Sequence, residues 1–143
     1  MPTRNASAVW EGDLVKGKGQ VKSDSGAINQ PYNFSNRFEN APGTNPEELL
    51  GAAHAACFSM ALSHMLASGG HVPTRVATKA AVTIDKVGEG FKITKIVLTC
   101  DAAVPGISEA AFLETANKAK AGCPVSQALA AVPTIELVAT LAK

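Results

Sequence analysis

The sequence has little excess charge of either sign and few cysteines. Its net charge is +1, with 13 Lys and Arg against 12 Asp and Glu spread over 143 residues. Because no basic stripe is available to neutralise phosphates, we expect no nucleic-acid partner. The three cysteines, Cys57, Cys100 and Cys123, are odd in number and widely spaced, unlike the disulfide framework of a secreted protein.

The sequence also lacks the pattern of a targeting segment. In MPTRNASAVWEGD no basic stretch precedes an apolar one, so we expect a reducing, cytoplasmic location. The long uncharged run 49–68 has the length of a membrane span. His54, Ser59 and His64 interrupt this run, and no basic loop flanks it. We therefore expect a buried central helix and no association with a membrane.

The order of apolar patterns predicts an α+β fold. With 46% hydrophobic and 17% charged residues, the chain suits a single domain over 1–143. Alternating patterns and turn residues predict three short strands, then a long helix, two long strands joined by VGEG, two helices and a last strand. The predicted ranges are 7–13, 17–26, 31–40, 45–68, 74–86, 91–104, 108–122, 123 onward and 134–141. We expect antiparallel sheets packed around the long central helix.

Capping signals support the predicted helices. Asn45, Pro46 and Glu48 have the spacing of an N-cap, a first helical residue and a capping box. Ser108 is a candidate N-cap for the second long helix. The glycines of GKGKGQ instead fall between two predicted strands, where a phosphate-binding loop is not expected. We therefore expect no nucleotide cofactor.

Two of the cysteines fall at predicted helices and suggest thiol chemistry. Cys57 lies inside the run GAAHAACFSM, whereas Cys123 directly precedes Pro124 and is a candidate helix N-cap. The positive end of the helix dipole would favour a thiolate at Cys123. Cys57 has no comparable local help, so its activation has to come from elsewhere in the fold.

The cysteine motifs identify a family. The runs GTNPEELLGAAHAACFSMAL and KAGCPVSQAL, with WEGD, GKGQV and FSNRFE, resemble the osmotically inducible protein C (OsmC) and organic hydroperoxide resistance (Ohr) family, in particular its OsmC branch. The resemblance covers nearly the whole chain. It implies an intertwined homodimer of the OsmC-like fold that reduces organic hydroperoxides through thiols, without metal or flavin.

The resemblance also assigns roles to site residues. It implies that Cys57 attacks the peroxide and becomes sulfenic acid, and that Cys123 traps this acid as a disulfide. An external dithiol, for example of the lipoyl type, would then reopen the disulfide. Of the three arginines in the chain, Arg37 matches the family's active-site arginine through FSNRFE, and the resemblance assigns the orienting carboxylate to Glu47.

The spacing of Glu47 and Cys57 suggests a dimer. Ten helical residues separate them and span about 15 Å, so one helix cannot bring both to a common site. Two antiparallel copies crossing near Ala52 would place Glu47 of one chain beside Cys57 of the other. The small residues of GAAHAA would allow such close packing, which we favour over the alternative that they pack on the chain's own sheet.

Two other functions stay open on the sequence alone. His54, Cys57 and Cys123 could hold zinc, although no Cys-x-x-Cys pair supports a zinc site. A noncatalytic carrier could bind an apolar ligand in a pocket lined by Phe58 and Met60. His54 could also pair with Cys57 as a nucleophile, but we favour a core histidine bonded to a backbone carbonyl. Cys100 is expected to be a small buried side chain.

Overall fold

The computed structural model describes all 143 residues. The chain divides into two compact units, Met1–Leu49 and Leu50–Lys143, and each is described below by itself. The single domain over 1–143 stays a prediction.

The N-terminal unit contains a small antiparallel sheet. Its strands are β1 (Ala6–Glu11), β2 (Lys18–Ser23) and β3 (Asn29–Tyr32), in the order β1-β2-β3. The rings of Trp10 and Tyr32 lie on β1 and β3 with centroids 5.4 Å apart. Gly19 on β2 leaves room for them, because a Cβ there would come within 2.5 Å of the Tyr32 ring.

The predicted strand over 31–40 is wrong beyond Tyr32. The chain turns there into the short helix α1 (Phe34–Phe38). Asn33 accepts a hydrogen bond from the Asn36 backbone N–H, and the Asn36 side chain accepts one from the Asn33 N–H, each at 3.0 Å. This reciprocal capping box starts a helix in a segment where the alternating pattern predicts a strand.

The long helix α2 (Pro46–Ser68) begins where the sequence predicts. The Asn45 side chain accepts a hydrogen bond of 2.8 Å from the Glu48 backbone N–H, and Pro46 occupies the first helical position. At the other end, Gly70 adopts a φ of +87°, and the His71 N–H bonds the Leu66 carbonyl at 2.9 Å. This is the glycine-terminated end that the Gly69-Gly70 pair predicts.

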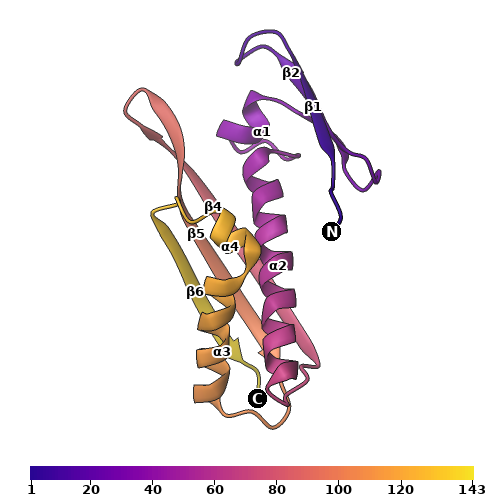
Figure 1. Ribbon diagram of the computed structural model, residues 1–143. Coiled ribbons are helices and arrows are strands. Elements are labelled where there is room, and N and C mark those ends of the chain that lie inside the picture. Colours follow the sequence, from indigo (N-terminus) through magenta and orange to yellow (C-terminus); the bar gives the residue numbers. More distant parts are fainter. The chain divides into compact units, whose positions relative to one another are not determined.

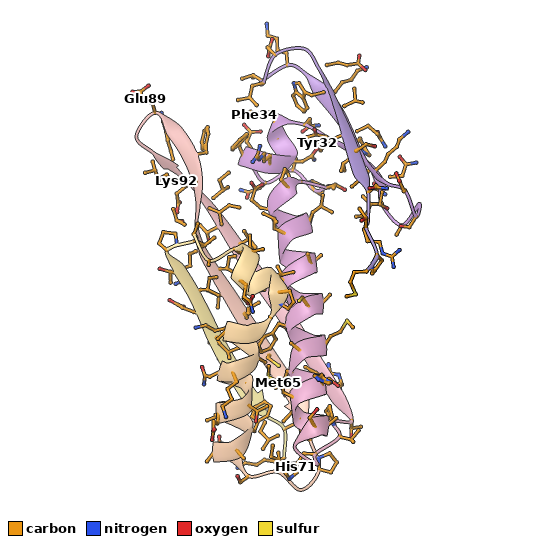
Figure 2. The ribbon with its side chains drawn as sticks, viewed as in Figure 1. Tyr32, Phe34, Met65, His71, Glu89 and Lys92 are labelled. Atoms are coloured by element: carbon orange, nitrogen blue, oxygen red, sulfur yellow. The ribbon has the colours of Figure 1, made fainter.

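The C-terminal unit contains a second three-stranded sheet in the order β4-β5-β6. The strands β4 (Arg75–Val87) and β5 (Gly90–Ala103) form an antiparallel hairpin, with Glu89 at its tip (Figure 2). The prediction of antiparallel sheets does not extend to β6 (Thr134–Leu141), which runs parallel to β5. The reason is that α3 (Glu109–Gly122) and α4 (Pro124–Ala128) form a crossover that returns the chain to the start of β5 (Figure 1).

The core of this unit lies between one face of the sheet and the helices (Figure 1). The side chains contributed by α2, β5 and α3 are Phe58, Leu62, Leu66, Ile96, Leu98, Cys100, Ala102, Phe112, Ala116 and Ala119. Burial of each large apolar side chain contributes about 1.5–3 kcal/mol. The only helix long and apolar enough to cross a membrane is α2, and its face with Phe58, Leu62 and Leu66 forms part of this core.

Candidate functional site

The two cysteines singled out by the sequence meet in the C-terminal unit. Cys57 lies in the middle of α2, and Cys123 lies at the N-cap of α4, directly before Pro124. Their side chains are joined by a hydrogen bond, and both are free thiols. Cys57 is half-buried, whereas Cys123 is fully buried. Two thiols 66 positions apart in the sequence therefore lie within hydrogen-bonding reach of each other.

The surroundings of the two thiols act on them in opposite directions. Burial, followed by the hydrogen bond to Cys123, raises the pKa of Cys57. Burial also raises the pKa of Cys123 and is the largest single effect on it, but hydrogen bonds from Cys57, Ser126 and Val125 together outweigh it and lower that pKa. Within this unit, Cys123 is therefore the thiol that ionises more readily. A positive charge beside the Cys57 sulfur would favour its ionisation.

His54 occupies the buried side of this site. It is fully buried on α2, and its Nε2 atom lies 2.7 Å from the Ser126 hydroxyl oxygen on α4. The expected backbone carbonyl partner of His54 is thus wrong, because the partner is a side-chain hydroxyl. Burial lowers the pKa of His54 and favours the neutral ring.

Ser126 is the residue that sequence reasoning missed. It is only 7% exposed and hydrogen-bonds Cys123 through both its backbone and its side chain. Its position three residues after Cys123, in CPVS, places it on the same side of the first turn of α4. That spacing is a signal that could have found it, since a serine three residues after an N-cap can reach the capping side chain.

Arg37 and Glu47 form the second predicted pair, which lies in the N-terminal unit. The Arg37 guanidinium donates to both carboxylate oxygens of Glu47, with Nη2 3.0 Å from Oε1 and Nε 3.2 and 3.3 Å from Oε1 and Oε2. Glu47 is only 6% exposed. The Arg37 Cζ atom also lies 5.1 Å from the centre of the Phe38 ring. Both residues are therefore held in a fixed orientation.

Arg37 borders an aromatic pocket of about 240 Å³ in the same unit. The other residues that line it are Trp10, Leu14, Tyr32, Asn33, Phe34 and Phe38, of which Tyr32 and Phe34 are labelled in Figure 2. A guanidinium at the border of an apolar pocket suits a ligand with a polar oxygen group and an apolar tail.

The structure does not form the zinc site or the carrier pocket that the sequence left open. No group of three or more His, Cys, Asp or Glu side chains is placed to hold a metal ion, so His54, Cys57 and Cys123 do not form the zinc site considered above. The carrier pocket is wrong as well, because Phe58 is fully buried in the core while Met60 is 75% exposed. Cys100 is 1% exposed, as expected of a small buried side chain.

Comparison with known proteins assigns the family. The family model described as OsmC-like protein matches residues 38–138. The chain belongs to the OsmC-like family. It is 57% identical over 134 residues to the peroxiredoxin OsmC of Escherichia coli (strain K12), covering 93% of this chain and 94% of the relative. It is 32% identical over 114 residues to the organic hydroperoxide resistance protein OhrB of Bacillus subtilis (strain 168), covering 77% and 80% of the two chains.

Solved structures of the OsmC-like family share the fold. The crystal structure of OhrB from Bacillus subtilis has a TM-score of 0.69 and 25% identity, over 96% of this chain and 98% of that one. An OsmC-like protein from Mycoplasma pneumoniae has a TM-score of 0.76 over 99% of both chains, at 18% identity. The predicted α+β fold and the predicted family are both confirmed.

Proposed function

We propose that this protein is a thiol peroxidase that reduces organic hydroperoxides to alcohols in oxidative or osmotic stress defence, with Cys57 as the attacking thiol and Cys123 as its partner. The observation that carries the proposal is the hydrogen bond between these two thiols. A peroxidase-type activity is supported by relatives named peroxiredoxin and organic hydroperoxide resistance protein. The roles proposed for the individual residues rest on the family resemblance and on the hydrogen bonds described above.

The proposed reaction begins at Cys57, the more exposed of the two sulfurs. Its thiolate attacks one peroxide oxygen, an S–O bond forms and the O–O bond breaks. The departing alkoxide takes up a proton and leaves as the alcohol. Cys57 then carries a sulfenic acid, which the adjacent Cys123 thiolate attacks with loss of water. The product is a Cys57–Cys123 disulfide that forms without large movement of α2 or α4, because the two side chains are already hydrogen-bonded.

Arg37 would supply the missing positive charge. The environment of Cys57 within its own unit raises its pKa, so a cation has to stabilise the thiolate and the developing alkoxide. A guanidinium presents several donors in one plane and can contact sulfur and oxygen together. The Glu47 carboxylate fixes the plane of that guanidinium through its hydrogen bonds. Glu47 is thus a positioning residue in this proposal.

A homodimer would bring the two pairs together. Glu47 and Cys57 both lie on the continuous helix α2, ten residues or about 15 Å apart. An antiparallel crossing of two α2 helices near Ala52 would place Arg37 and Glu47 of one chain beside Cys57 of the other. The exposed side chains Ala52, Ala53 and Ala56 are small enough to allow a close crossing.

The remaining steps require a partner molecule. An external dithiol, for example of the lipoyl type, would reduce the disulfide and restore both thiols. A reducing, cytoplasmic location is consistent with three free cysteines. The aromatic pocket beside Arg37 favours hydroperoxides with an apolar tail over hydrogen peroxide.

Stoichiometric oxidation followed by mass spectrometry tests the proposed function. One equivalent of an alkyl hydroperoxide should join Cys57 to Cys123 in the wild type. In Cys123→Ser, oxidation should stop at the sulfenic acid of Cys57 or proceed to sulfinic acid. Cys57→Ser should leave the peroxide unreacted. Peroxide consumption at the wild-type rate by Cys57→Ser would contradict the proposal.

A further inference from the structure

The surroundings of the His54 ring determine which residue donates the hydrogen bond between His54 and Ser126. The side chain is fully buried, Nε2 lies 2.7 Å from the Ser126 Oγ, and Nδ1 has no partner. A proton on Nδ1 would leave a buried N–H without an acceptor, which is rarer and more costly than a bare nitrogen lone pair. The proton therefore belongs on Nε2. The ring donates this hydrogen bond, and the Ser126 oxygen accepts it.

This direction leaves the Ser126 hydroxyl hydrogen free for another acceptor. The side chain of Ser126 also hydrogen-bonds Cys123, so its O–H points to that sulfur. The backbone N–H groups of Val125 and Ser126 bond the same sulfur from the first turn of α4. His54 thus orients one of several donors that converge on Cys123. Cys57 receives a hydrogen bond from the Val125 backbone and itself donates one to Cys123.

The two sulfurs also differ in accessibility. Cys123 is 0% exposed in the C-terminal unit, whereas Cys57 is half-buried. A reductant approaching a disulfide between them reaches the Cys57 sulfur first. Thiol–disulfide exchange is faster when the sulfur that leaves is the better-stabilised thiolate. Accessibility and hydrogen bonding therefore both favour attack on the Cys57 sulfur, with Cys123 leaving as the thiolate.

We propose that His54 and Ser126 form a hydrogen-bond relay that holds Cys123 as the leaving thiolate when the disulfide is reduced, so that the external dithiol attacks Cys57. This inference rests on the proposed function in one respect, because it concerns the Cys57–Cys123 disulfide proposed there. His54 acts through Ser126 and is a positioning residue, while Ser126 touches the reacting sulfur.

The proposed reduction is balanced in atoms and electrons. A thiolate of the dithiol attacks the Cys57 sulfur, and the Cys57–Cys123 bond breaks with its electron pair moving to Cys123. The second thiol of the reductant then attacks the sulfur of its own mixed disulfide and displaces Cys57 as a thiolate. The dithiol loses two electrons and becomes a cyclic disulfide. Its two protons end on the two cysteines.

Trapping the mixed disulfide tests the direction of attack. The disulfide is formed with diamide, which does not depend on peroxide chemistry, and is treated with dihydrolipoamide that has one sulfur alkylated. After rapid quenching with N-ethylmaleimide, peptide mass spectrometry should find the reductant on Cys57 and maleimide on Cys123. The reverse labelling would overturn the inference. Failure of diamide to form the bridge would overturn it as well, because the two sulfurs could then not bond.

A second experiment tests the relay itself. In a Cys57→Ala background, thiolate absorbance at 240 nm is titrated, and Ser126→Ala should raise the pKa of Cys123. In the otherwise native chain, the same change should slow reduction of the disulfide at least about tenfold, the effect of losing a hydrogen bond to a charged sulfur. The matched control is Ser59→Ala. Ser59 lies on the same helix as His54, and its hydroxyl is hydrogen-bonded to Thr78 on β4. Equal titration curves and rates for Ser126→Ala and the control would overturn the relay.

Replacement of His54 separates positioning from packing. His54→Gln keeps an N–H donor near the position of Nε2, whereas His54→Leu fills a similar volume without a donor. The glutamine variant should retain the low Cys123 pKa, and the leucine variant should lose it. Equal pKa values in two folded variants would contradict the role of His54. A wild type that forms the bridge with diamide but not with alkyl hydroperoxide would instead contradict the proposed peroxidase, leaving the relay intact.

Discussion

The Arg37 guanidinium donates three hydrogen bonds to the Glu47 carboxylate, ten positions later in the sequence. The carboxylate is nearly buried, whereas the guanidinium is 37% exposed and keeps donors free for another group. A charged donor fixed in this way can stabilise an anion without first being reorganised, as the proposed function requires of this pair.

We predict that Arg37→Lys lowers kcat/KM for an alkyl hydroperoxide at least about tenfold, because an ammonium cannot hold Glu47 and contact sulfur and oxygen in one plane. The measurement is peroxide consumption with a dithiol reductant in excess. Arg75→Lys is the matched control, since Arg75 is 66% exposed and lies 3.9 Å from Asp101. Equal losses in the two variants would speak against a specific role for Arg37.

We predict that Cys100→Ala leaves formation of the Cys57–Cys123 disulfide unchanged. Cys100 lies on β5 in the core, and burial raises the pKa of its thiol and keeps it neutral. Loss of the sulfur should cost roughly 1 kcal/mol of unfolding free energy. Urea denaturation measures the cost, and peptide mapping after peroxide treatment measures the bridge. A bridge that includes Cys100 in the wild type would contradict this prediction.

We predict that acid destabilises the fold partly through His54. Its pKa in the folded chain lies below the ordinary value of 6.5, so the unfolded chain binds a proton that the folded chain excludes. Unfolding free energy should therefore decrease as the pH falls below about 6.5. His54→Gln removes this titration, so its unfolding free energy should depend less steeply on pH between about 5 and 7. Identical pH slopes in urea titrations would refute the prediction.

We predict that Ala52→Glu converts a dimer into monomers. Under the proposed two-fold crossing, the two introduced carboxylates would face one another in a desolvated contact, where like charges repel strongly. Sedimentation velocity measures the assembly state. Ala110→Glu on the exposed side of α3 is the control and should stay dimeric. A wild-type monomer with full peroxidase activity would contradict both the proposed crossing of two α2 helices and the proposed site shared between two chains.

Local signals in the sequence predict most of the fold. Asn45 and Ser108 cap helices where their side chains suggest, because capping depends on residues three positions apart. The same rule applied to Asn33 and Asn36 would have predicted α1, in place of the strand that the alternating pattern suggests. The parallel pairing of β5 with β6 depends on the path of the intervening helices, so no local pattern predicts it.

The site is less accessible to sequence reasoning than the fold. The roles of Arg37 and Glu47 follow from the family resemblance, and the structure adds that the two side chains are hydrogen-bonded. The contact between His54 and Ser126 joins residues 72 positions apart, and neither residue carries a pattern that indicates the other. Such a pair becomes visible only when packing has brought α2 and α4 together.

Under the proposed function, the crossover between β5 and β6 would link disulfide chemistry to completion of the fold. Cys123 lies within this connection, and the strand that anchors its far end consists of residues 134–141, close to the C-terminus. The N-cap geometry that presents Cys123 to Cys57 depends on a connection held at both ends. The final strand can pair with β5 only after residues 134–141 have been synthesised. Under the proposed function, formation of the Cys57–Cys123 disulfide would therefore report that this connection is in place.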